Sequence, residues 1–259
     1  MKAGGDIFWS LFNEFNFWAV ITFVIVMVWM FHHSLRYRSK DGSNNNVDEF
    51  KPGVFPKEND DMRMELTWTI VPFILIIYLT YIAWGPIDEM WTADPDAHEV
   101  RVTGNQWYWD FDCDPYRNTA DAPASSIPME NRSSSMFYDA NGELICEISN
   151  KELDSTGDGI DDLTVPLLRL TAEVSYLFNL TSNDVTHAPF FLDWGLKEDT
   201  QPGMYTRLYH TPGVDEIGAS FLMCTEYCGA AHSDMTAVVE VCGDLTDEDT
   251  CEGTPLQWW

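Results

Sequence analysis

The sequence predicts a membrane protein of the α+β class, in which a hairpin of two transmembrane helices is followed by a β domain outside the membrane. Two long stretches without a charged residue lie in the first third of the chain, and short apolar stretches separated by Pro, Gly, Asn and Asp make up the rest. The 259 residues include 42 acidic and 14 basic side chains, a formal net charge of −28. A chain this acidic would be repelled by phosphate, which argues against nucleic acid as a partner.

The two uncharged stretches account for the predicted helices. Residues 15–35 and residues 66–87 contain no Asp, Glu, Lys or Arg over 21 and 22 positions. At about 1.5 Å of rise per residue, each is long enough to cross a hydrocarbon layer of roughly 30 Å. We therefore expect transmembrane helices over about 10–33 and 66–87. The alternative for either stretch is a buried helix of a soluble protein or an uncleaved signal sequence.

The distribution of basic residues predicts the orientation of the hairpin. Segment 34–64, between the two helices, carries six of the 14 basic side chains, whereas residues 86–259 carry seven among 33 acidic ones. Because loops rich in Lys and Arg stay inside, 34–64 is the expected inside loop. Both termini then lie on the outer side, which is periplasmic, extracellular or intermembrane space. The expected domains are a hairpin over 1–91 and an extracytoplasmic domain over 92–259.

The extracytoplasmic part has the pattern of a β domain. Its apolar or alternating stretches are short and are bounded by turn residues, which suits a Greek-key sandwich or barrel. Residues 112–162 are richer in turn residues and are expected to form an insertion. The expected strands fall within residues 98–111, 167–182, 216–224 and 235–242.

One short segment concentrates groups that bind metals. Cys224, Cys228, His232 and Met235 follow one another with the spacing Cys-x3-Cys-x3-His-x2-Met. Two thiolates, an imidazole and a thioether together favour copper, because methionine is rarely recruited for zinc. A second imidazole is needed, and His187 is its expected source, just after an apolar strand.

The extra cysteine distinguishes two kinds of copper site. A single blue-copper ion needs one Cys, two His and a weak Met, so Cys224 would be left over. Two thiolates can instead bridge two copper ions, each with its own His and one weak ligand, and such a centre shares one electron and relays it. A structural Cys2His2 zinc site or a disulfide between Cys224 and Cys228 would be the alternatives.

Four segments in the same order resemble subunit II of the haem-copper respiratory oxidases, the cytochrome c oxidases. They are ELTWTIVP (65–72), GNQWYWDF (104–111), DVTHAPFFLDWGLKEDTQPG (184–203) and CTEYCGAAHSDM (224–235). The resemblance implies a cupredoxin-like Greek-key β-barrel with the dinuclear copper centre CuA. It also implies a Mg²⁺ shared with subunit I through the Glu226 carboxylate. The implied copper ligands are His187, Cys224, Cys228, His232, Met235 and the backbone carbonyl of Glu226.

The resemblance also implies partners and an electron path. Electrons would come one at a time from cytochrome c or a small copper protein and enter through the run Trp107, Tyr108 and Trp109. They would pass from CuA to haem in subunit I, which bears CuB, for reduction of oxygen coupled to proton translocation, with subunit III also in the complex. Asp184 would lie beside the donor docking patch and Glu65 at the entrance of a proton pathway. A membrane-tethered copper-binding or copper-delivery protein is the alternative.

Two features fall outside these motifs. Four further cysteines are expected to pair in an oxidising compartment, and of three possible connectivities sequence proximity favours Cys113 with Cys146 and Cys242 with Cys251. The stretch DSTGDGIDD has aspartates around two glycines and resembles a calcium loop, in which oxygen ligands stand at alternate positions; the alternative is a solvated acidic turn. Its candidate calcium ligands are Asp154, Asp158 and Asp162.

Overall fold

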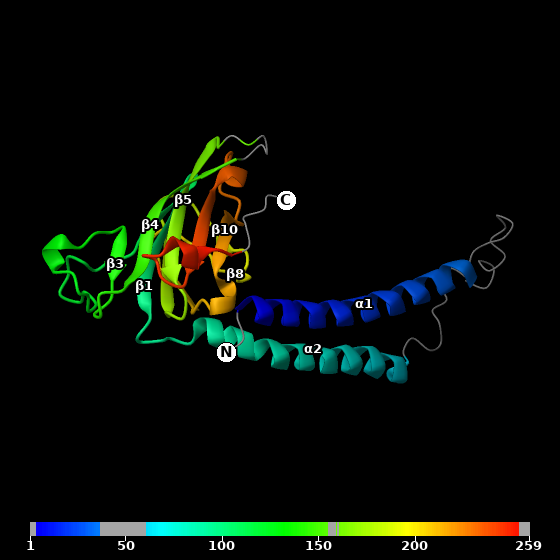
Figure 1. Cartoon of the computed structure of the whole chain (residues 1–259). Coiled ribbons are helices and arrows are strands. Elements are labelled where there is room, and N and C mark those ends of the chain that lie inside the picture. The colour runs from blue at the N-terminus through cyan, green and yellow to red at the C-terminus, as the bar shows by residue number, and fades with distance from the viewer. Residues whose placement is uncertain (1–3, 37–60, 155–158, 160, 254–259) are drawn as a thin grey trace. The chain divides into compact units, whose positions relative to one another are not determined.

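The computed structural model describes residues 4–36, 61–154, 159 and 161–253 (Figure 1). The chain divides into a helical unit, Trp9–Gly85, and a second unit that contains all residues from Pro86 onward. Residues 37–60, most of the expected inside loop, lie outside the described part of the chain.

Two helices, α1 (Gly4–Arg36) and α2 (Met62–Trp91), form the N-terminal part of the chain. Both extend beyond the expected ranges. Within them, Trp9–Arg36 and Met62–Asp88 are long and apolar enough to cross a membrane, judged by length and composition. The first turn of α2 is capped by Asp61, whose Oδ1 accepts hydrogen bonds from the backbone N–H of Arg63 (3.0 Å) and Met64 (3.3 Å).

A polar contact joins the two helices. Glu14 Oε1 accepts a hydrogen bond from the Tyr78 hydroxyl of α2 (2.7 Å) and another from Trp18 Nε1 of its own helix (3.0 Å). The Trp18 and Tyr78 rings also meet edge to face, with centroids 6.0 Å apart. Hydrogen bonds of this kind stabilise helix pairs in a hydrocarbon environment, where no water competes for the donors.

The β domain consists of two sheets (Figure 1). The four-stranded sheet has the order β2-β1-β6-β9 and the seven-stranded sheet has the order β3-β4-β5-β11-β10-β7-β8. Two pairings are parallel, β1 with β6 and β5 with β11, and the other pairings are antiparallel. The strands are β1 (His98–Asn105), β2 (Tyr108–Asp112), β3 (Met136–Tyr138), β4 (Leu144–Leu153), β5 (Leu163–Thr171), β6 (Tyr176–Ser182), β7 (Pro189–Phe191), β8 (Leu196–Lys197), β9 (Thr206–His210), β10 (Gly218–Cys224) and β11 (Thr236–Cys242).

Buried and more exposed residues alternate along the strands, and the buried ones form the main core. In β1 every second residue is buried, so Val100 and Val102 point inward while Arg101 points outward. The same cluster contains Phe178 of β6 and Leu168 of β5, so both sheets contribute to it. Two expected strands are each divided in the structure: 98–111 by a turn at 106–107, and 167–182 by a turn at 172–175, where Glu173 has φ 64°.

The expected insertion at 112–162 is more ordered than a loop. Strand β4 pairs with β5 from Cys146↔Leu170 to Leu153↔Leu163 and is therefore an integral part of the larger sheet. The irregular part is the segment 113–135, which carries only the one-turn helix η2 (Met129–Asn131). Sequence reasoning missed β4 because the second half of the strand carries mostly polar residues. Such residues occur in a strand that has one face open to solvent.

Both disulfides that sequence proximity favours are present. Cys113–Cys146 ties the start of segment 113–135 to β4, and Cys242–Cys251 ties the end of β11 to the short helix η5 (Glu248–Cys251). Cys224 and Cys228 remain free and buried. The pairing of the other four thiols leaves these two available for metal.

A buried ion pair holds segment 113–135 in place. Arg132 donates from Nη2 to the Pro123 carbonyl (2.8 Å) and from Nε to the Ile127 carbonyl (3.3 Å), and its Nη1 lies 3.7 Å from Asp114 Oδ2. The Asp114 side chain is fully buried, and neither carboxylate oxygen has a hydrogen-bond partner among the described residues. Burial raises the pKa of Asp114, while Arg132 opposes that shift. Arg132 is therefore the counter-charge on which the buried carboxylate depends.

His98 gives the β domain a defined sensitivity to acid. Its ring is buried, stacks on Phe137 and donates from Nε2 to the Cys113 carbonyl at 2.7 Å. Burial lowers the pKa of His98 to about 4, below its ordinary value of 6.5. The unfolded chain therefore binds a proton that the folded chain does not, and stability is lost as the pH falls from about 6.5 to about 4.

We expect this single group to remove about 3 kcal/mol of stability across that range. The measurement is urea unfolding of the full chain in detergent at pH 7 and pH 4.5, compared with His98→Gln, which cannot titrate there. The wild type should lose more stability than the variant on acidification. Equal losses would show that His98 is not buried in its neutral form.

Candidate metal centre

The pairing of three strands brings the two halves of the candidate site together. Cys224 is the last residue of β10, and it pairs with Pro189 at the start of β7. His187, two residues before β7, is fixed by backbone hydrogen bonds in both directions with Thr200 (3.1 and 2.7 Å). The chain after Cys224 then turns through a loop that includes the short helix η4 (His232–Asp234) and returns as β11.

All six predicted copper donors lie in one cluster. The two thiols are 3.8 Å apart, Sγ to Sγ. Cys224 Sγ lies 3.9 Å from His187 Nδ1 and 3.3 Å from the Glu226 carbonyl oxygen. Cys228 Sγ lies 3.4 Å from His232 Nδ1 and 3.9 Å from Met235 Sδ. Each thiol thus has one imidazole and one weak donor beside it.

Burial suits this cluster to a soft metal. Cys224, Cys228, His187 and Met235 are buried, and His232 is partly exposed. Burial and, after it, the neighbouring Cys224 raise the pKa of the Cys228 thiol to about 12. Without a cation the thiol therefore keeps its proton, and binding of a metal releases it. The donor set of two thiols, two imidazoles, a thioether and a carbonyl fits two copper ions.

A glycine provides the space for His187. A Cβ added at Gly104 would lie 2.7 Å from His187 Cδ2, a distance that real Cβ atoms essentially never show. The Trp109 ring also packs edge to face against the His187 imidazole, with the two ring centroids 6.0 Å apart. A glycine inside a strand often marks such a close approach, and this is the signal that could have identified Gly104 from the sequence.

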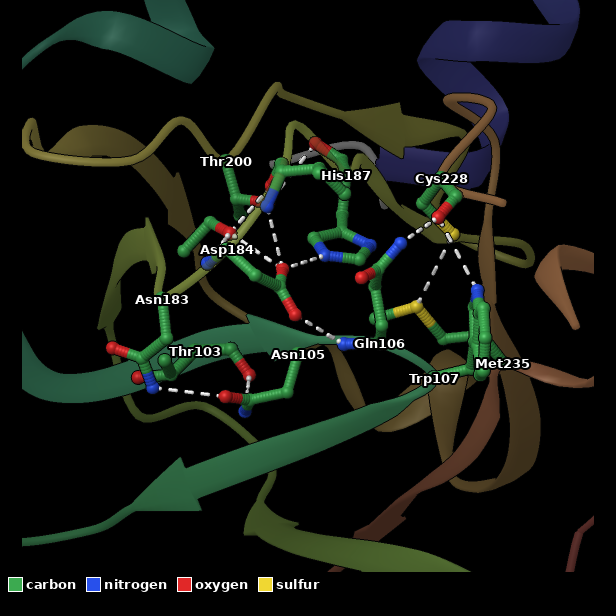
Figure 2. Close-up of polar contacts among 12 residues, drawn as sticks. Thr103, Asn105, Gln106, Trp107, Asn183, Asp184, His187, Thr200, Cys228 and Met235 are labelled. Carbon is green, nitrogen blue, oxygen red and sulfur yellow. Dashed lines mark hydrogen bonds and ion pairs between the residues drawn. The ribbon is translucent and has the colours of Figure 1, made fainter. Parts of the chain in front are cut away.

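Asp184 is directed toward the candidate ligand His187 (Figure 2). Its Oδ1 accepts a hydrogen bond from His187 Nε2 at 2.8 Å, and its Oδ2 accepts one from the Gln106 backbone N–H at 2.6 Å. Burial alone would raise the pKa of Asp184, but the hydrogen bonds from His187, Val185 and Gln106 outweigh it and lower the pKa. A carboxylate in this position fixes the ring so that Nδ1 faces Cys224. The sequence analysis expected Asp184 only at a docking patch and missed this contact.

The aromatic run Trp107, Tyr108 and Trp109 is divided between surface and core. Trp107 is 38% exposed, and its Nε1 donates to the Cys228 carbonyl at 3.2 Å. Tyr108 is exposed, whereas Trp109 is buried. Gln106, which the sequence analysis did not single out, donates from Nε2 to the same carbonyl at 2.6 Å.

The remaining predicted residues lie on α2, in the ligand loop, and between β4 and β5, where Asp158 is outside the described residues. Glu65 is partly exposed in the first turn of α2. The Glu226 carboxylate is partly exposed in the ligand loop. Asp154 Oδ2 accepts a hydrogen bond from the Gly159 N–H at 2.6 Å, and Asp158 is not among the described residues.

Comparison with known proteins shows the family to which the chain belongs. A family model described as "Cytochrome C oxidase subunit II, periplasmic domain" matches residues 98–242, more than half of the chain and the whole segment that carries the donors. The chain belongs to the cytochrome c oxidase subunit II family. The predicted fold class is thereby confirmed: apolar N-terminal helices followed by a cupredoxin-like β domain. The chain is a membrane protein of a family of copper-binding oxidase subunits.

Individual relatives are distant in sequence. Cytochrome c oxidase subunit 2 of Myxine glutinosa is 27% identical over 189 residues, which cover 70% of this chain and 69% of the relative. The same subunit of Pneumocystis carinii is 24% identical over 232 residues, covering 89% and 82%. That of Cereibacter sphaeroides is 24% identical over 222 residues, covering 86% and 65%.

Two solved structures are similar in part. The periplasmic domain of subunit II of the cytochrome oxidase of Bradyrhizobium japonicum shares 17% identity, with a TM-score of 0.38, and the match covers 58% of this chain and 88% of that one. A chain of a heme-copper terminal oxidase dimer solved by cryo-EM shares 14% identity, with a TM-score of 0.37, over 69% and 99%.

Proposed function

We propose that this subunit accepts electrons one at a time from an external carrier at a dinuclear CuA centre and passes them to haem in subunit I. The oxidase complex would use them to reduce oxygen to water, coupled to proton translocation. The observation that carries the proposal is the pair of free thiols 3.8 Å apart, each beside its own imidazole and its own weak donor. A site for a single copper ion or for zinc does not need two thiols that each have their own imidazole and their own weak donor.

The residues of this chain would hold and tune the centre. Cys224 and Cys228 would hold two copper ions between them, and the metal centre would supply one-electron redox chemistry shared by both ions. The protein keeps the donors in nearly fixed positions, because His187 is held by Thr200 and Asp184 and the thiols lie in the packed core. A site that changes little between its oxidation states transfers electrons quickly.

The aromatic run supports a direction for electron transfer. Trp107 is exposed on one side and donates a hydrogen bond to the Cys228 carbonyl on the other, so it offers a short covalent and hydrogen-bonded path from the surface to a copper ligand. Tyr108 widens the exposed aromatic surface. A donor, either a cytochrome c or a small copper protein, would bind there, with Asp184 nearby.

Further roles are proposed on the family resemblance, with the orientation resting on the distribution of basic residues and the calcium loop on the pattern of aspartates. The helices would pack on subunit I, with subunit III in the same complex and both termini on the outer side of the membrane. Glu226 would also bind Mg²⁺ at the subunit I boundary, and Glu65 would lie at the entrance of a proton pathway. Asp154, Asp158 and Asp162 stay a candidate calcium loop, which a calcium-dependent rise in melting temperature would support.

The test of the proposed function is the metal content and the electron paramagnetic resonance spectrum of the full chain, purified in detergent and loaded with copper. We expect two coppers per chain and one unpaired electron delocalised over both. One localised copper would instead favour a blue-copper site or a copper-delivery protein. Preferential binding of zinc, with no signal, would contradict the proposal.

A further inference from the structure

We propose that Gln106 is a positioning residue of the metal centre, which connects the ligand loop to the carboxylate that orients His187. The inference rests on the proposed function, because it concerns the copper ligands. Gln106 lies between Asp184 on one side and Cys228 on the other (Figure 2). It contacts neither thiol directly in any hydrogen bond of the described residues, so its effect on the metal would pass through those two neighbours.

The side chain of Gln106 holds the ligand loop. Its Nε2 donates to the Cys228 carbonyl at 2.6 Å, across 122 residues of sequence, and Trp107 Nε1 donates to the same oxygen at 3.2 Å. The carbonyl and the thiol of Cys228 belong to one residue. Fixing the carbonyl therefore fixes the backbone from which the thiol projects toward Cys224.

The main chain of Gln106 holds the other half of the site. Its N–H donates to Asp184 Oδ2 at 2.6 Å, and Asp184 Oδ1 accepts from His187 Nε2 at 2.8 Å. A continuous series of hydrogen bonds thus runs from the Cys228 carbonyl through Gln106 and Asp184 to His187. Two candidate ligands from separate segments of the chain are held at a fixed separation by one residue between them.

The ligand loop is shaped to admit this side chain. Gly229, next to Cys228, has φ +124°, a conformation that residues with a side chain rarely adopt. A Cβ there would lie 3.1 Å from Gln106 Nε2 and 3.2 Å from Trp107 Cζ2, tighter than most real contacts. The glycine therefore turns the Cys228 carbonyl toward Gln106 and leaves room for its amide.

The experiment compares Gln106→Ala and Gln106→Leu with the wild-type full chain, loaded with copper in detergent. Gln106→Leu keeps most of the side-chain volume but has neither a hydrogen-bond donor nor a metal ligand, so it separates the hydrogen bond from the space that the side chain fills. In both variants we expect copper to pass to a chelator about 10-fold faster, with altered copper hyperfine splitting, because partners behind a metal ligand typically contribute at this level.

Asn105→Ala is the matched control. Asn105 is the neighbouring residue, and its side chain bonds Thr103 and Asn183 but no candidate ligand. We expect its copper release rate to stay within about twofold of the wild type. A wild-type rate and spectrum in both Gln106 variants would overturn the inference and leave the proposed function intact. A wild-type chain without a shared-electron signal would contradict the proposed function, and the inference with it, before any variant is compared.

Discussion

Replacing Cys228 with serine is expected to reduce copper binding from two ions per chain to one at most and to abolish the delocalised spin signal. The Cys228 thiol lies 3.8 Å from Cys224 Sγ, 3.4 Å from His232 Nδ1 and 3.9 Å from Met235 Sδ. It is therefore next to three of the other five candidate donors. A serine hydroxyl has nearly the same shape but is a hard ligand that keeps its proton, so it cannot supply the soft thiolate that this site offers to copper. Oxygen consumption by the complex with its electron donor should fall by about 100-fold or more, since even partners behind the ligands are worth roughly 10–100-fold.

The measurement combines copper analysis, electron paramagnetic resonance and oxygen uptake of the purified complex. Tyr227→Phe provides a control in the same loop, because Tyr227 is exposed and offers no donor to the cluster of candidate ligands, although its ring lies near His232. That variant should keep both coppers. A Cys228→Ser complex that retained two coppers and the shared-electron signal would show that this thiol does not bridge them.

Replacing Arg132 with methionine should destabilise the β domain by about 3–5 kcal/mol, because it leaves the Asp114 carboxylate buried without its counter-charge. For a domain of this size the melting temperature should fall by roughly 10 °C. The loss should shrink as the pH is lowered, since protonation of Asp114 removes the unpaired charge, and burial already raises the pKa of that group. Thermal unfolding of the full chain, followed by circular dichroism between pH 5 and pH 8, measures both effects.

Two further variants test the cause of that loss. Adding Asp114→Asn to Arg132→Met removes the buried charge and should restore part of the lost stability. Lys151→Met breaks a 3.2 Å pair with Glu240 in which the lysine side chain is 32% exposed, so it should cost less than about 1 kcal/mol. If Arg132→Met and Lys151→Met melted at the same temperature, the Asp114–Arg132 pair would not be buried as the structure has it.

Sequence reasoning was sufficient where the signal is local. Cys224, Cys228, His232 and Met235 lie within twelve residues, and their spacing alone predicts a copper loop, whose donors the structure brings into one cluster. The helices follow from uncharged length, and the disulfide pairs follow from proximity along the chain. These features depend on neighbours in sequence, so no knowledge of the tertiary structure was needed to find them.

Features that depend on the tertiary structure could not be found in this way. Gln106 and Cys228 are 122 residues apart, and a glutamine in an aromatic segment carries no signal of a contact so distant along the chain. Asp184 is only three residues from His187, but their contact depends on the conformation of the turn between β6 and β7, which the sequence does not specify. The same holds for β4, whose place in the sheet is fixed by pairing rather than by its own apolar pattern.

The parallel pairings have a consequence for how the subunit matures. Strand β1 pairs with β6 from His98↔Tyr176 to Gly104↔Ser182, and β5 pairs with β11 from Val238↔Leu167 to Cys242↔Thr171, so the chain must close loops of more than 70 residues before either sheet is complete. Structures dominated by such distant contacts fold slowly. His187 is brought to the ligand loop by the pairing of β7 with β10, in the same seven-stranded sheet that the β5–β11 pairing completes. Copper insertion is therefore expected to be a late step of biogenesis, taking place on a domain that has already folded outside the membrane.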